Sequence, residues 1–482
     1  MDALVNAVNN LIWSKALIAL CLGAGLYFSI RTRFMQVRGL AEMLRLMLQG
    51  NSSASGVSSF QALAMSLSGR VGIGNIAGVA TAIAYGGPGA VFWMWMVAFL
   101  GASTAYIEST LAQIYKEKDE QGQYRGGPAY YIEKAMGQKW YAWIFAVATI
   151  LATGLLLPGV QANGIASSMQ AAWGVPPLAT AIGIGLVLGF IIFGGLRRIA
   201  VFAELVVPFM ALAYILVALA ILIVNAGKVP EVIALVFRSA FGFEAAFGAV
   251  LGLAVEWGVK RGIYSNEAGQ GTGPHPAAAA EVSHPAKQGY VQAFSIYVDT
   301  LMVCSATAFM ILATGKYNVI NPNGGLLVEA LPGIEPGPGF AQNAVSTVLA
   351  GQGPGFVALA IMFFAFTTIV AYYYMAETNI AYINRKVHRP WMILALRVGI
   401  LAAVVYGTVR SASTAWALGD IGVGLMAWLN IVAILILQKP ALLALKDYEA
   451  QKKAGKDPVF DPDALGIKNA ELWKEINPPK RD

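Results

Sequence analysis

The chain has 482 residues, of which 57% are hydrophobic and only 12% charged, with a formal net charge of +7. Soluble proteins carry about 25% charged residues, so this composition excludes a water-soluble enzyme. Apolar runs of roughly 18 to 28 residues, each long enough to cross a ~30 Å hydrocarbon core, recur along the chain. Runs such as 92–101 lack the alternation of a transmembrane β-barrel strand. The sequence therefore predicts an all-α polytopic membrane protein.

The hydrophobic runs divide the chain into three regions. Residues 1–57 are predicted to hold a retained N-terminal transmembrane helix and a cytoplasmic amphipathic segment, 58–437 the membrane core, and 438–482 a polar cytoplasmic tail. The tail is predicted to be surface or disordered rather than core. In chain order we predict eleven spans, at about 11–30, 58–85, 88–114, 140–171, 176–194, 200–225, 243–264, 289–314, 346–382, 391–409 and 413–437.

The positive charges give this layout an orientation. Lys and Arg concentrate on the cytoplasmic side of short loops, and nearly all of them fall on the connections that share a side with the tail. The opposite side holds only Lys15, Lys228, Arg238, Lys316 and Arg410. We therefore expect the N-terminus outside and the C-terminus inside, and we interpret the basic balance as topology rather than nucleic-acid binding. The external loop at about 315–345, rich in Gly, Pro and Asn, is a candidate lid.

Two spans are interrupted by glycine. The span at 58–85 contains the run 68–78, and the span at 243–264 contains Gly248, Gly252 and Gly258 before the glycine-rich run 262–273. After the N-terminal helix is set aside, these are the first and sixth of ten spans, which is the pattern of an inverted-repeat transporter with its site where both helices unwind. The alternative is that the glycines only let helices pack closely.

An unwound stretch inside a membrane persists where it lines a cavity or binds something. Its free N–H groups suit an anionic group, and its carbonyl oxygens suit a small hard cation. The natural pair is an amino acid carboxylate and Na⁺.

Five motifs together resemble one family, the alanine or glycine:cation symporters, also called sodium:alanine symporters. They are VGIGNIAGVA at 71–80, GGPGAVFWMW at 86–95, ESTLAQ at 108–113, RGGPAYYIE at 125–133 and GVKRGIYSNEAG at 258–269. The similarity extends from about Ser59 to Asn430. It implies a LeuT-type fold, which is a five-plus-five inverted repeat, here with one extra N-terminal helix.

The resemblance also implies the site residues. The amides around Ile73, Gly74 and Asn75 would hold the substrate carboxylate, and the substrate pocket would further involve Gln161, Asn163, Gly252, Thr368 and Tyr372. The sodium ligands would be the carbonyl oxygens of Ser68, Val71 and Phe364 and the hydroxyls of Thr367 and Thr368. Two bland alternatives stay open. Adjacent threonines often bond to their own helix backbone, and the Gln161 and Asn163 pair would also serve as an interhelical contact.

Three departures from the family pattern bear on specificity. Ile73 stands where relatives often have Thr, and Ala371-Tyr372 stands where they have Gly-Trp. The usual Ser-Ala-Pro-Asn is Thr272-Gly-Pro-His275 here, in an intracellular segment. The first two changes leave the size and identity of the substrate open.

Ionisable residues inside spans are costly and are functional candidates. These are Arg70, Glu108, Glu204, Glu256, Asp299, Glu377, Arg397 and Asp420. We expect Arg70 and Glu256 to form an inner-gate ion pair, and Glu108 and Glu377 to make structural salt bridges near cytoplasmic ends. His275, His284 and His388 are expected to be solvated loop residues. Cys21 and Cys304 lie in apolar runs and are expected to act as small hydrophobes.

These patterns favour a secondary symporter in the cell membrane that imports a small neutral amino acid, alanine or glycine, with Na⁺ as coupling ion and no organic cofactor. A proton-coupled or glutamine-preferring transporter of the same fold is the alternative. An ion channel would show selectivity rings, and none is apparent. A primary pump would need a nucleotide-binding motif, which the sequence lacks.

Overall fold

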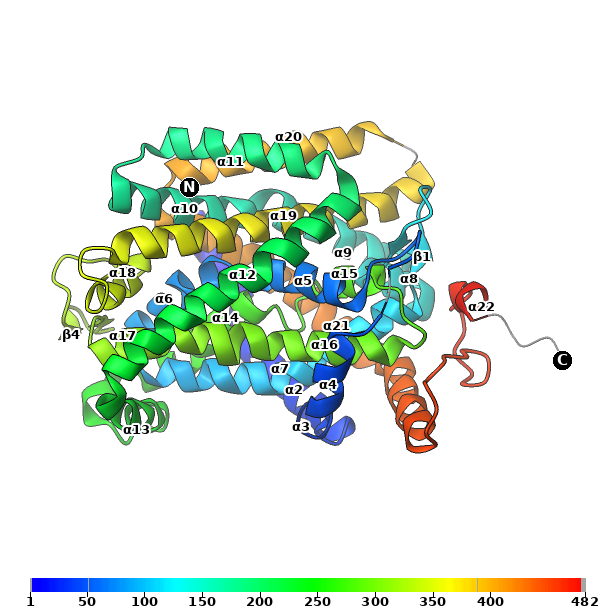
Figure 1. Ribbon diagram of the computed structural model, residues 1–482, viewed down its shortest axis with the longest axis horizontal. Helices are drawn as coiled ribbons and strands as arrows, with labels where there is room; N and C mark the ends of the chain where they lie inside the picture. The colour runs from blue at the N-terminus through cyan, green and yellow to red at the C-terminus, as the bar shows by residue number, and fades with distance from the viewer. Residues whose placement is uncertain (1, 51, 388, 478–482) are drawn as a thin grey trace.

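The computed structural model describes residues 2–50, 52–387 and 389–477, and within them the chain is almost entirely helical. Figure 1 shows the long helices running along the long axis of the molecule, with the connecting segments gathered at its two ends. One end carries α8, β1 and α22, and the other carries α13, α18 and β4. The molecule is thus a helical bundle with two distinct ends.

The first half of the chain contains α1 (Asp2–Ile12), α2 (Lys15–Arg31), α3 (Met35–Arg38), α4 (Leu40–Met47), α5 (Ser59–Arg70), the 3₁₀ turn η1 (Ile73–Asn75), α6 (Ala77–Gly86), α7 (Gly89–Ile114), β1 (Glu117–Lys118), β2 (Tyr124–Arg125), α8 (Pro128–Met136), α9 (Lys139–Leu151), the π-helical η2 (Ala152–Leu156), α10 (Leu157–Trp173), α11 (Pro177–Ile192) and α12 (Gly195–Val224). Strands β1 and β2 pair antiparallel.

The second half contains η3 (Ala226–Lys228), α13 (Val229–Ala240), η4 (Ala245–Val250), α14 (Leu251–Asn266), α15 (Pro274–Ala279), α16 (Pro285–Ile296), the π-helical η5 (Tyr297–Cys304), α17 (Ser305–Thr314), β3 (Asn318–Ile320), β4 (Leu326–Glu329), α18 (Pro338–Ser346), α19 (Gly353–Val387), α20 (Trp391–Val409), α21 (Ala412–Lys453) and α22 (Leu472–Ile476). Strands β3 and β4 form an antiparallel hairpin within the predicted external loop.

The lengths of these helices confirm a polytopic membrane protein. In the described residues, eight helices are long and apolar enough to cross a membrane, and the bent pair Ala226–Ala240 and Ala245–Asn266 makes a ninth if counted as one span. Two further apolar helices, Ala77–Gly86 and Pro177–Ile192, are shorter and are not among these eight.

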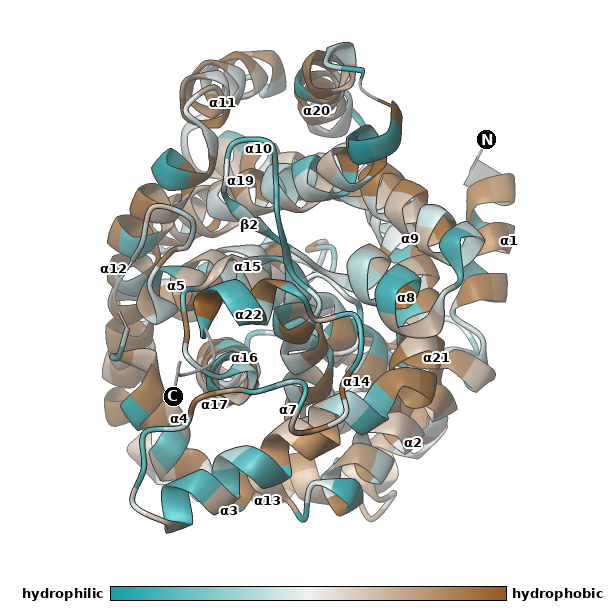
Figure 2. Cartoon of the chain, turned by 90° about the vertical axis from the view of Figure 1, so that its right-hand side faces the viewer, coloured by the Kyte–Doolittle hydropathy of each residue, from teal (hydrophilic) through white to brown (hydrophobic). Residues whose placement is uncertain are grey.

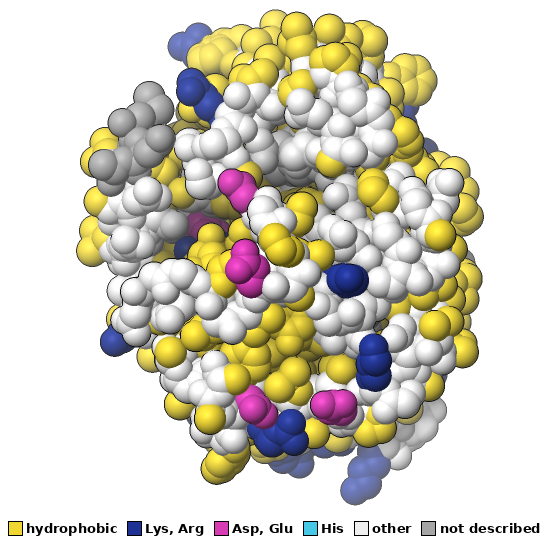
Figure 3. Space-filling model, turned by 90° about the vertical axis from the view of Figure 1, so that its left-hand side faces the viewer, with side chains coloured by type: hydrophobic (Ala, Val, Ile, Leu, Met, Phe, Trp, Pro, Cys, Tyr) yellow, Lys and Arg dark blue, Asp and Glu magenta, His cyan; other side chains and the backbone are white. Residues whose placement is uncertain are grey.

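The apolar side chains face outward as well as inward, as expected for a protein surrounded by lipid. On α12, for example, Leu205 and Phe209 are 74% and 70% exposed, whereas Val207 and Tyr214 are buried. Figure 2 shows hydrophobic colour around the rim of the bundle and hydrophilic colour over the end that faces the viewer. The opposite end, in Figure 3, shows only scattered charged side chains on a largely uncharged surface.

The first broken helix lies where the sequence predicts it. Helix α5 starts with a capping box between Ser58 and Gln61, ends at Arg70, and is separated from α6 by the segment 71–76. Within this segment Gly72 is extended, with φ −133° and ψ −153°. The interruption leaves backbone groups free to make contacts outside a helix.

The second break lies later than predicted. Helix α14 is continuous from Leu251 to Asn266, and the interruption falls at residues 267–273, before α15. A β-carbon on Gly258 would lie 2.6 Å from the Ala90 carbonyl oxygen, so this glycine allows close packing against α7 and does not unwind the helix. The 3₁₀ segment η4 precedes α14 within 243–264, but the interruption that meets the first break lies in the glycine-rich run 262–273.

The C-terminal tail is not the surface segment that its composition predicts. Helix α21 continues without interruption to Lys453, and both Phe460 and Trp473 are buried. The Trp473 indole N–H donates to the Gln113 carbonyl at 3.0 Å, and the Phe460 amide donates to the Ser283 carbonyl at 3.0 Å. Figure 2 shows α22 lying over this end of the bundle. A few aromatic side chains thus anchor an otherwise polar tail.

Candidate substrate and cation site

The unwound segment 71–76 is buried at the centre of the bundle and is held by side chains from other helices. The Gly72 amide donates to Asn75 Oδ1 at 2.8 Å, and the Ile73 amide donates to Gln161 Oε1 on α10 at 3.0 Å. The Thr307 hydroxyl on α17 donates to the Asn75 carbonyl at 2.6 Å. Side chains therefore replace the backbone partners that a continuous helix would supply.

Oxygen atoms from α5, the unwound segment and α19 converge on one point. The Thr368 hydroxyl lies 2.8 Å from the Ser68 carbonyl oxygen, 3.4 Å from that of Val71 and 2.9 Å from that of Phe364. The Thr367 hydroxyl lies 2.9 Å from the Phe364 carbonyl oxygen. Both threonines do bond to their own helix, but Thr368 also bridges to the unwound segment. The five residues are buried and bring neutral carbonyl and hydroxyl oxygens together, which are suitable ligands for a hard cation.

Next to these oxygens, polar groups gather around Gln161. Its side chain faces the hydroxyls of Tyr264 on α14 and Tyr372 on α19, both buried. The Tyr264 hydroxyl lies near Gln161 but has no hydrogen bond of good geometry within the described part of the chain. Buried polar groups normally have such a partner. The Tyr264 ring packs on Trp416 with centroids 4.8 Å apart. This arrangement offers an amino acid one unpaired donor and a wall of aromatic rings.

A buried carboxylate also contacts the unwound segment. The Asn75 amide donates to Asp299 Oδ1 at 2.6 Å, and the Ser265 hydroxyl donates to Asp299 Oδ2 at 2.9 Å. Asp299 lies in the π-helical η5, which widens the helix at this point. In the sequence, Asp299 is only an ionisable residue in a span, because no motif connects it to the glycine run. Its contacts with Asn75 and Ser265 join the two broken helices to η5.

A profile of the sodium:alanine symporter family matches residues 1–462. The chain belongs to this family. A Bacillus subtilis protein whose name is that of a sodium/proton-dependent alanine carrier is 62% identical over 475 residues, 98% of each chain. The B. subtilis sodium/glutamine symporter GlnT is 44% identical, with 98% of this chain and 96% of GlnT covered. The sodium/alanine symporter AgcS of Methanococcus maripaludis is 35% identical over 94% of this chain and 98% of AgcS. These matches confirm the resemblance seen in the motifs.

Two residues expected in the substrate pocket of this family member do not face the unwound segment. Asn163 donates to the carbonyls of Gly407 and Arg410, at 2.9 and 2.8 Å, and so makes an interhelical contact. Gly252 is exposed in the first turn of α14, whereas the other end of that helix, at Tyr264, meets the unwound segment. The structure therefore does not bring Gly252 to the site.

The expected gate pair is not formed in this conformation. The Arg70 guanidinium donates to the Asn266 carbonyl at 2.7 Å, to Gln292 Oε1 at 3.0 Å and to the Ser295 hydroxyl. Glu256 is partly buried on α14 and makes no ion pair with Arg70 within the described residues. Arg70 instead fastens the end of α14, where the second break begins, to α16.

The other ionisable residues in the spans hold helices together. Glu377 pairs with Arg125 at 3.4 Å, as predicted. Glu108 forms no ion pair among the described side chains and instead accepts from the Gly269 amide at 3.2 Å and from Asn430 at 2.7 Å. Asp420 pairs with Arg261 at 2.6 Å and Lys260 at 2.9 Å, outside the Tyr264 and Trp416 rings. Glu204 accepts from Gln61, and Arg397 donates to Tyr373.

The described histidines are not solvated loop residues, as the sequence analysis expected. His275 and His284 are fully buried, and His388 lies outside the described residues. His275 bridges the Thr272 carbonyl and the Asn379 side chain, at 2.9 and 2.8 Å. Burial lowers the pKa of His284, which faces Asp447 at 3.1 Å. His275 is covered by α19 and His284 by the rings of Tyr448 and Phe460.

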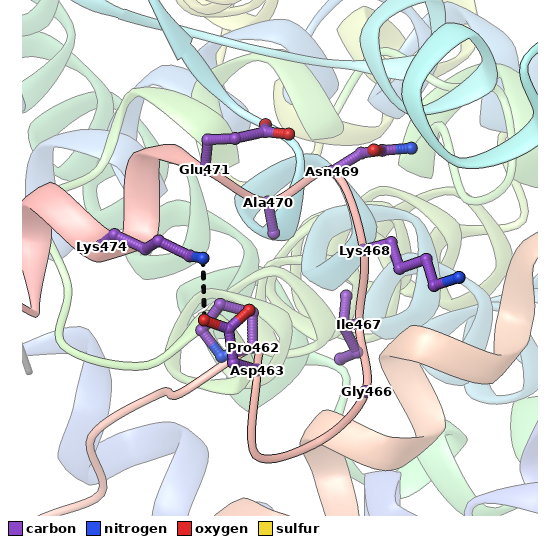
Figure 4. A pocket seen from close by; sticks show the side chains of 9 residues that line it. All are labelled: Pro462, Asp463, Gly466, Ile467, Lys468, Asn469, Ala470, Glu471 and Lys474. Carbon is purple, nitrogen blue, oxygen red and sulfur yellow. Dashed lines mark ion pairs between the residues drawn. The ribbon is translucent and has the colours of Figure 1, made fainter.

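Surface pockets lie apart from this centre. The pocket in Figure 4 is built by the tail around the ion pair of Lys474 and Asp463, 2.8 Å apart. An apolar groove between α10, α11, α12 and α19 is lined by residues such as Met169 and Phe366. Neither surface contains the polar groups that converge at the unwound segment.

Proposed function

We propose that this protein is a sodium-coupled symporter that imports a small neutral amino acid, alanine or glycine, by alternating access. The observation that carries the proposal is the convergence of the Ser68, Val71 and Phe364 carbonyl oxygens on the Thr368 hydroxyl. The set contains no carboxylate, so its own ligands would not neutralise the charge of one bound Na⁺. That charge would attract the carboxylate of an amino acid bound beside it.

The unwound segment 71–76 contributes to both the proposed cation site and the proposed carboxylate site. Its carbonyl oxygens face Thr368, and its Ile73 amide faces Gln161. A substrate carboxylate would replace Gln161 Oε1 as the acceptor of that amide, and the Tyr264 hydroxyl beside Gln161 would gain a well-aligned partner. An ion that orders the segment also orders the amides, so each ligand favours the conformation that binds the other.

Large side chains around the unwound segment favour a small substrate. The Ile73 side chain packs against Gly164 on α10, and a β-carbon there would lie 2.7 Å from Ile73 Cγ1. Tyr264 and Tyr372 bound the other sides. The names of two relatives specify alanine, which agrees with this size, whereas GlnT is named for glutamine.

The proposed topology is that of the LeuT-type repeat in the cell membrane. The eight long helices, the bent pair ending in α14, the broken pair α5 and α6, and α11 would together make up the eleven proposed spans. After the first span, α5 with α6 and α14 with α15 are the first and sixth of ten. The polar, tail-bearing end in Figure 2 would face the cytoplasm, with the N-terminus outside.

The deciding experiment measures alanine uptake by purified protein in proteoliposomes. An imposed inward Na⁺ gradient should drive saturable uptake above the level reached with K⁺, and gramicidin should abolish the accumulation. A thermal-shift series with alanine, glycine, serine and glutamine, each with and without Na⁺, identifies the bound substrate, because a ligand of the folded state raises its stability. Uptake that neither saturates nor depends on the gradient would show a channel instead.

A further inference from the structure

The second break holds a carboxylate that the transport site does not use. Glu267 caps α14 in the left-handed region, with φ 59°, and its side chain is 1% exposed. Its Oε2 accepts from the Thr272 hydroxyl at 2.8 Å, across the break. Its Oε1 has no hydrogen-bond partner within the described part of the chain. A buried carboxylate oxygen without a partner is costly when it is ionised.

Glu267 lies against the elements that form the cation site. A β-carbon on Gly69 of α5 would lie 3.4 Å from Glu267 Oε2, and 3.7 Å from the Ala371 β-carbon of α19. Gly69 is the neighbour of Ser68, and Ala371 lies less than one turn from Thr368. A change of charge at Glu267 therefore alters the electrostatic environment of both α5 and α19, which supply the proposed cation ligands.

The charges around Glu267 do not balance. Arg70 faces Glu267, Glu108 and Asp299, and its Nη2 atom has no partner among the described residues. None of the three carboxylates forms an ion pair with Arg70 in the described part of the chain. One cation surrounded by three buried carboxylates leaves an excess of negative charge, which the low-dielectric interior opposes.

The hydrogen bonds distinguish the three carboxylates. Both oxygens of Glu108 accept, from Gly269 and Asn430, and both oxygens of Asp299 accept, from Asn75 and Ser265. Donors on both oxygens stabilise a negative charge. Only Glu267 has a bare oxygen, and that is where a proton would be held.

We propose that Glu267 is the proton-binding site of this transporter, which deepens the proposed function and rests on it. A proton from the external water forms an O–H bond at Oε1, and the carboxylate becomes a neutral acid. After the protein opens inward, the same O–H bond breaks, the proton passes to cytoplasmic water, and the regained negative charge is free to approach Arg70. Since Thr272 lies inside the break and Arg70 bonds to Asn266 at its start, this change in charge favours one position of α15 over another.

Other titratable groups near Glu267 belong in the interpretation of any pH profile. They are Arg70 on α5, Glu108 on α7, Asp299 on η5, Tyr264 on α14, His275 on α15 and Tyr372 on α19. The test therefore compares variants at single positions and does not rely on one pH profile.

The test uses the full chain in proteoliposomes with equal Na⁺ on both sides. Wild-type protein should take up alanine severalfold faster at an external pH of about 6 than at about 8, and alanine should acidify the lumen, as reported by a trapped pH dye. Glu267→Gln should bring the ratio of the two rates to about one and abolish the acidification. Glu204→Gln, a carboxylate on α12 outside this cluster, is the matched control and should keep the wild-type ratio.

Wild-type acidification that persists in Glu267→Gln would overturn the proposal, and so would a wild-type lumen that does not acidify. If Glu267→Gln does not elute as a folded protein, Thr272→Val tests the same site without changing the carboxylate. Loss of the hydroxyl should move the midpoint of the uptake profile to higher pH, and Thr272→Ser should restore it. Identical midpoints in all three proteins would contradict the proposal. Failure of Na⁺ gradients to drive alanine uptake is a separate result that bears on the proposed function.

Discussion

At the scale of single residues, the Thr368 hydroxyl joins α19 to the unwound segment. Thr368→Ala removes one oxygen of the proposed cation site but leaves an apolar helix surface. We expect the Na⁺ concentration for half-maximal uptake to rise about tenfold or more, because a contact to a charged group contributes about 1.5–3 kcal/mol. Thr368→Ser retains the oxygen and should stay near the wild-type value. An unchanged Na⁺ dependence in the alanine variant would move the cation site away from α19.

A side chain at Gly72 would disturb both the proposed cation site and the proposed carboxylate site. A β-carbon there would lie 2.6 Å from Thr368 Oγ1 and 2.9 Å from Gln161 Oε1. Gly72→Ala should reduce alanine uptake and Na⁺ affinity together by about tenfold or more, since overpacking costs about 1–3 kcal/mol. Gly183→Ala, on α11 where nothing lies within 4 Å, is the control for helix substitution. Wild-type uptake by Gly72→Ala would show that the segment relaxes away from Thr368.

Gly74 has a different neighbour. Its β-carbon would lie 3.1 Å from the Tyr264 ring, so Gly74→Val would push the two broken helices apart before it reached a ligand. Approach of a substrate carboxylate to Gly74 stays a prediction.

Tyr372 is the position where specificity is expected to differ from Trp-bearing relatives. It is buried beside Gln161 and brings a hydroxyl to the pocket. In competition uptake, Tyr372→Trp should weaken serine relative to alanine by up to about tenfold, because pocket changes of this size are worth about 1–3 kcal/mol. Tyr373→Phe, at the neighbouring position facing Arg397, should leave the ranking unchanged. The same ranking in Tyr372→Trp would show that this ring does not bound the substrate.

At the scale of elements, the tail and the segment after α7 hold each other. The buried Lys116 ammonium donates to the Ala280 carbonyl at 2.9 Å and lies 4.0 Å from the Tyr124 ring centre and 5.2 Å from that of Trp473. Burial lowers the pKa of Lys116 to about 7, against a weaker opposing effect of Glu281. The docked tail thus encloses a lysine that readily loses its proton.

This pKa predicts how stability changes with pH. Lysine in an unfolded chain titrates at about 10.4, so from about pH 7 to about pH 10 the unfolded state binds more protons and the folded state gains stability as the pH rises. Thermal unfolding in detergent should show this increase in the wild type and a smaller one in Lys116→Met. Lys118→Met, which removes the exposed partner of Glu475, should follow the wild type. Equal pH slopes in all three proteins would mean that Lys116 stays hydrated.

At the scale of the whole molecule, the unequal ends of the bundle predict a fixed orientation. Cys21 and Cys304 are free and buried, as predicted, so the native chain offers a low background for thiol labelling. A membrane-impermeant maleimide should label Asn323→Cys, in the β3–β4 hairpin, in intact cells. Glu471→Cys, in the tail, should react only after permeabilisation. The reverse pattern would invert the proposed topology.

Much of the architecture can be predicted from the sequence alone. Hydrophobic length indicated a helical membrane protein, the glycine run at 68–78 indicated the first break, and the family resemblance implied the oxygens around Thr368. Glycine content did not locate the second break, because Gly258 resembles a break glycine in the sequence but packs against α7. Polar composition did not predict the buried tail, because burial of Trp473 depends on a distant carbonyl at Gln113.

The sequence by itself determined the membrane class, the family and the first unwound helix, because each depends on local composition or on a short continuous motif. Only the tertiary structure decided which polar groups meet. Asp299 reaches Asn75, and Glu267 lies beside Gly69, although each pair is separated by about two hundred residues. Such contacts depend on helices packed across the bundle, and a side chain's partners there are fixed by its depth and direction rather than by its neighbours in the chain.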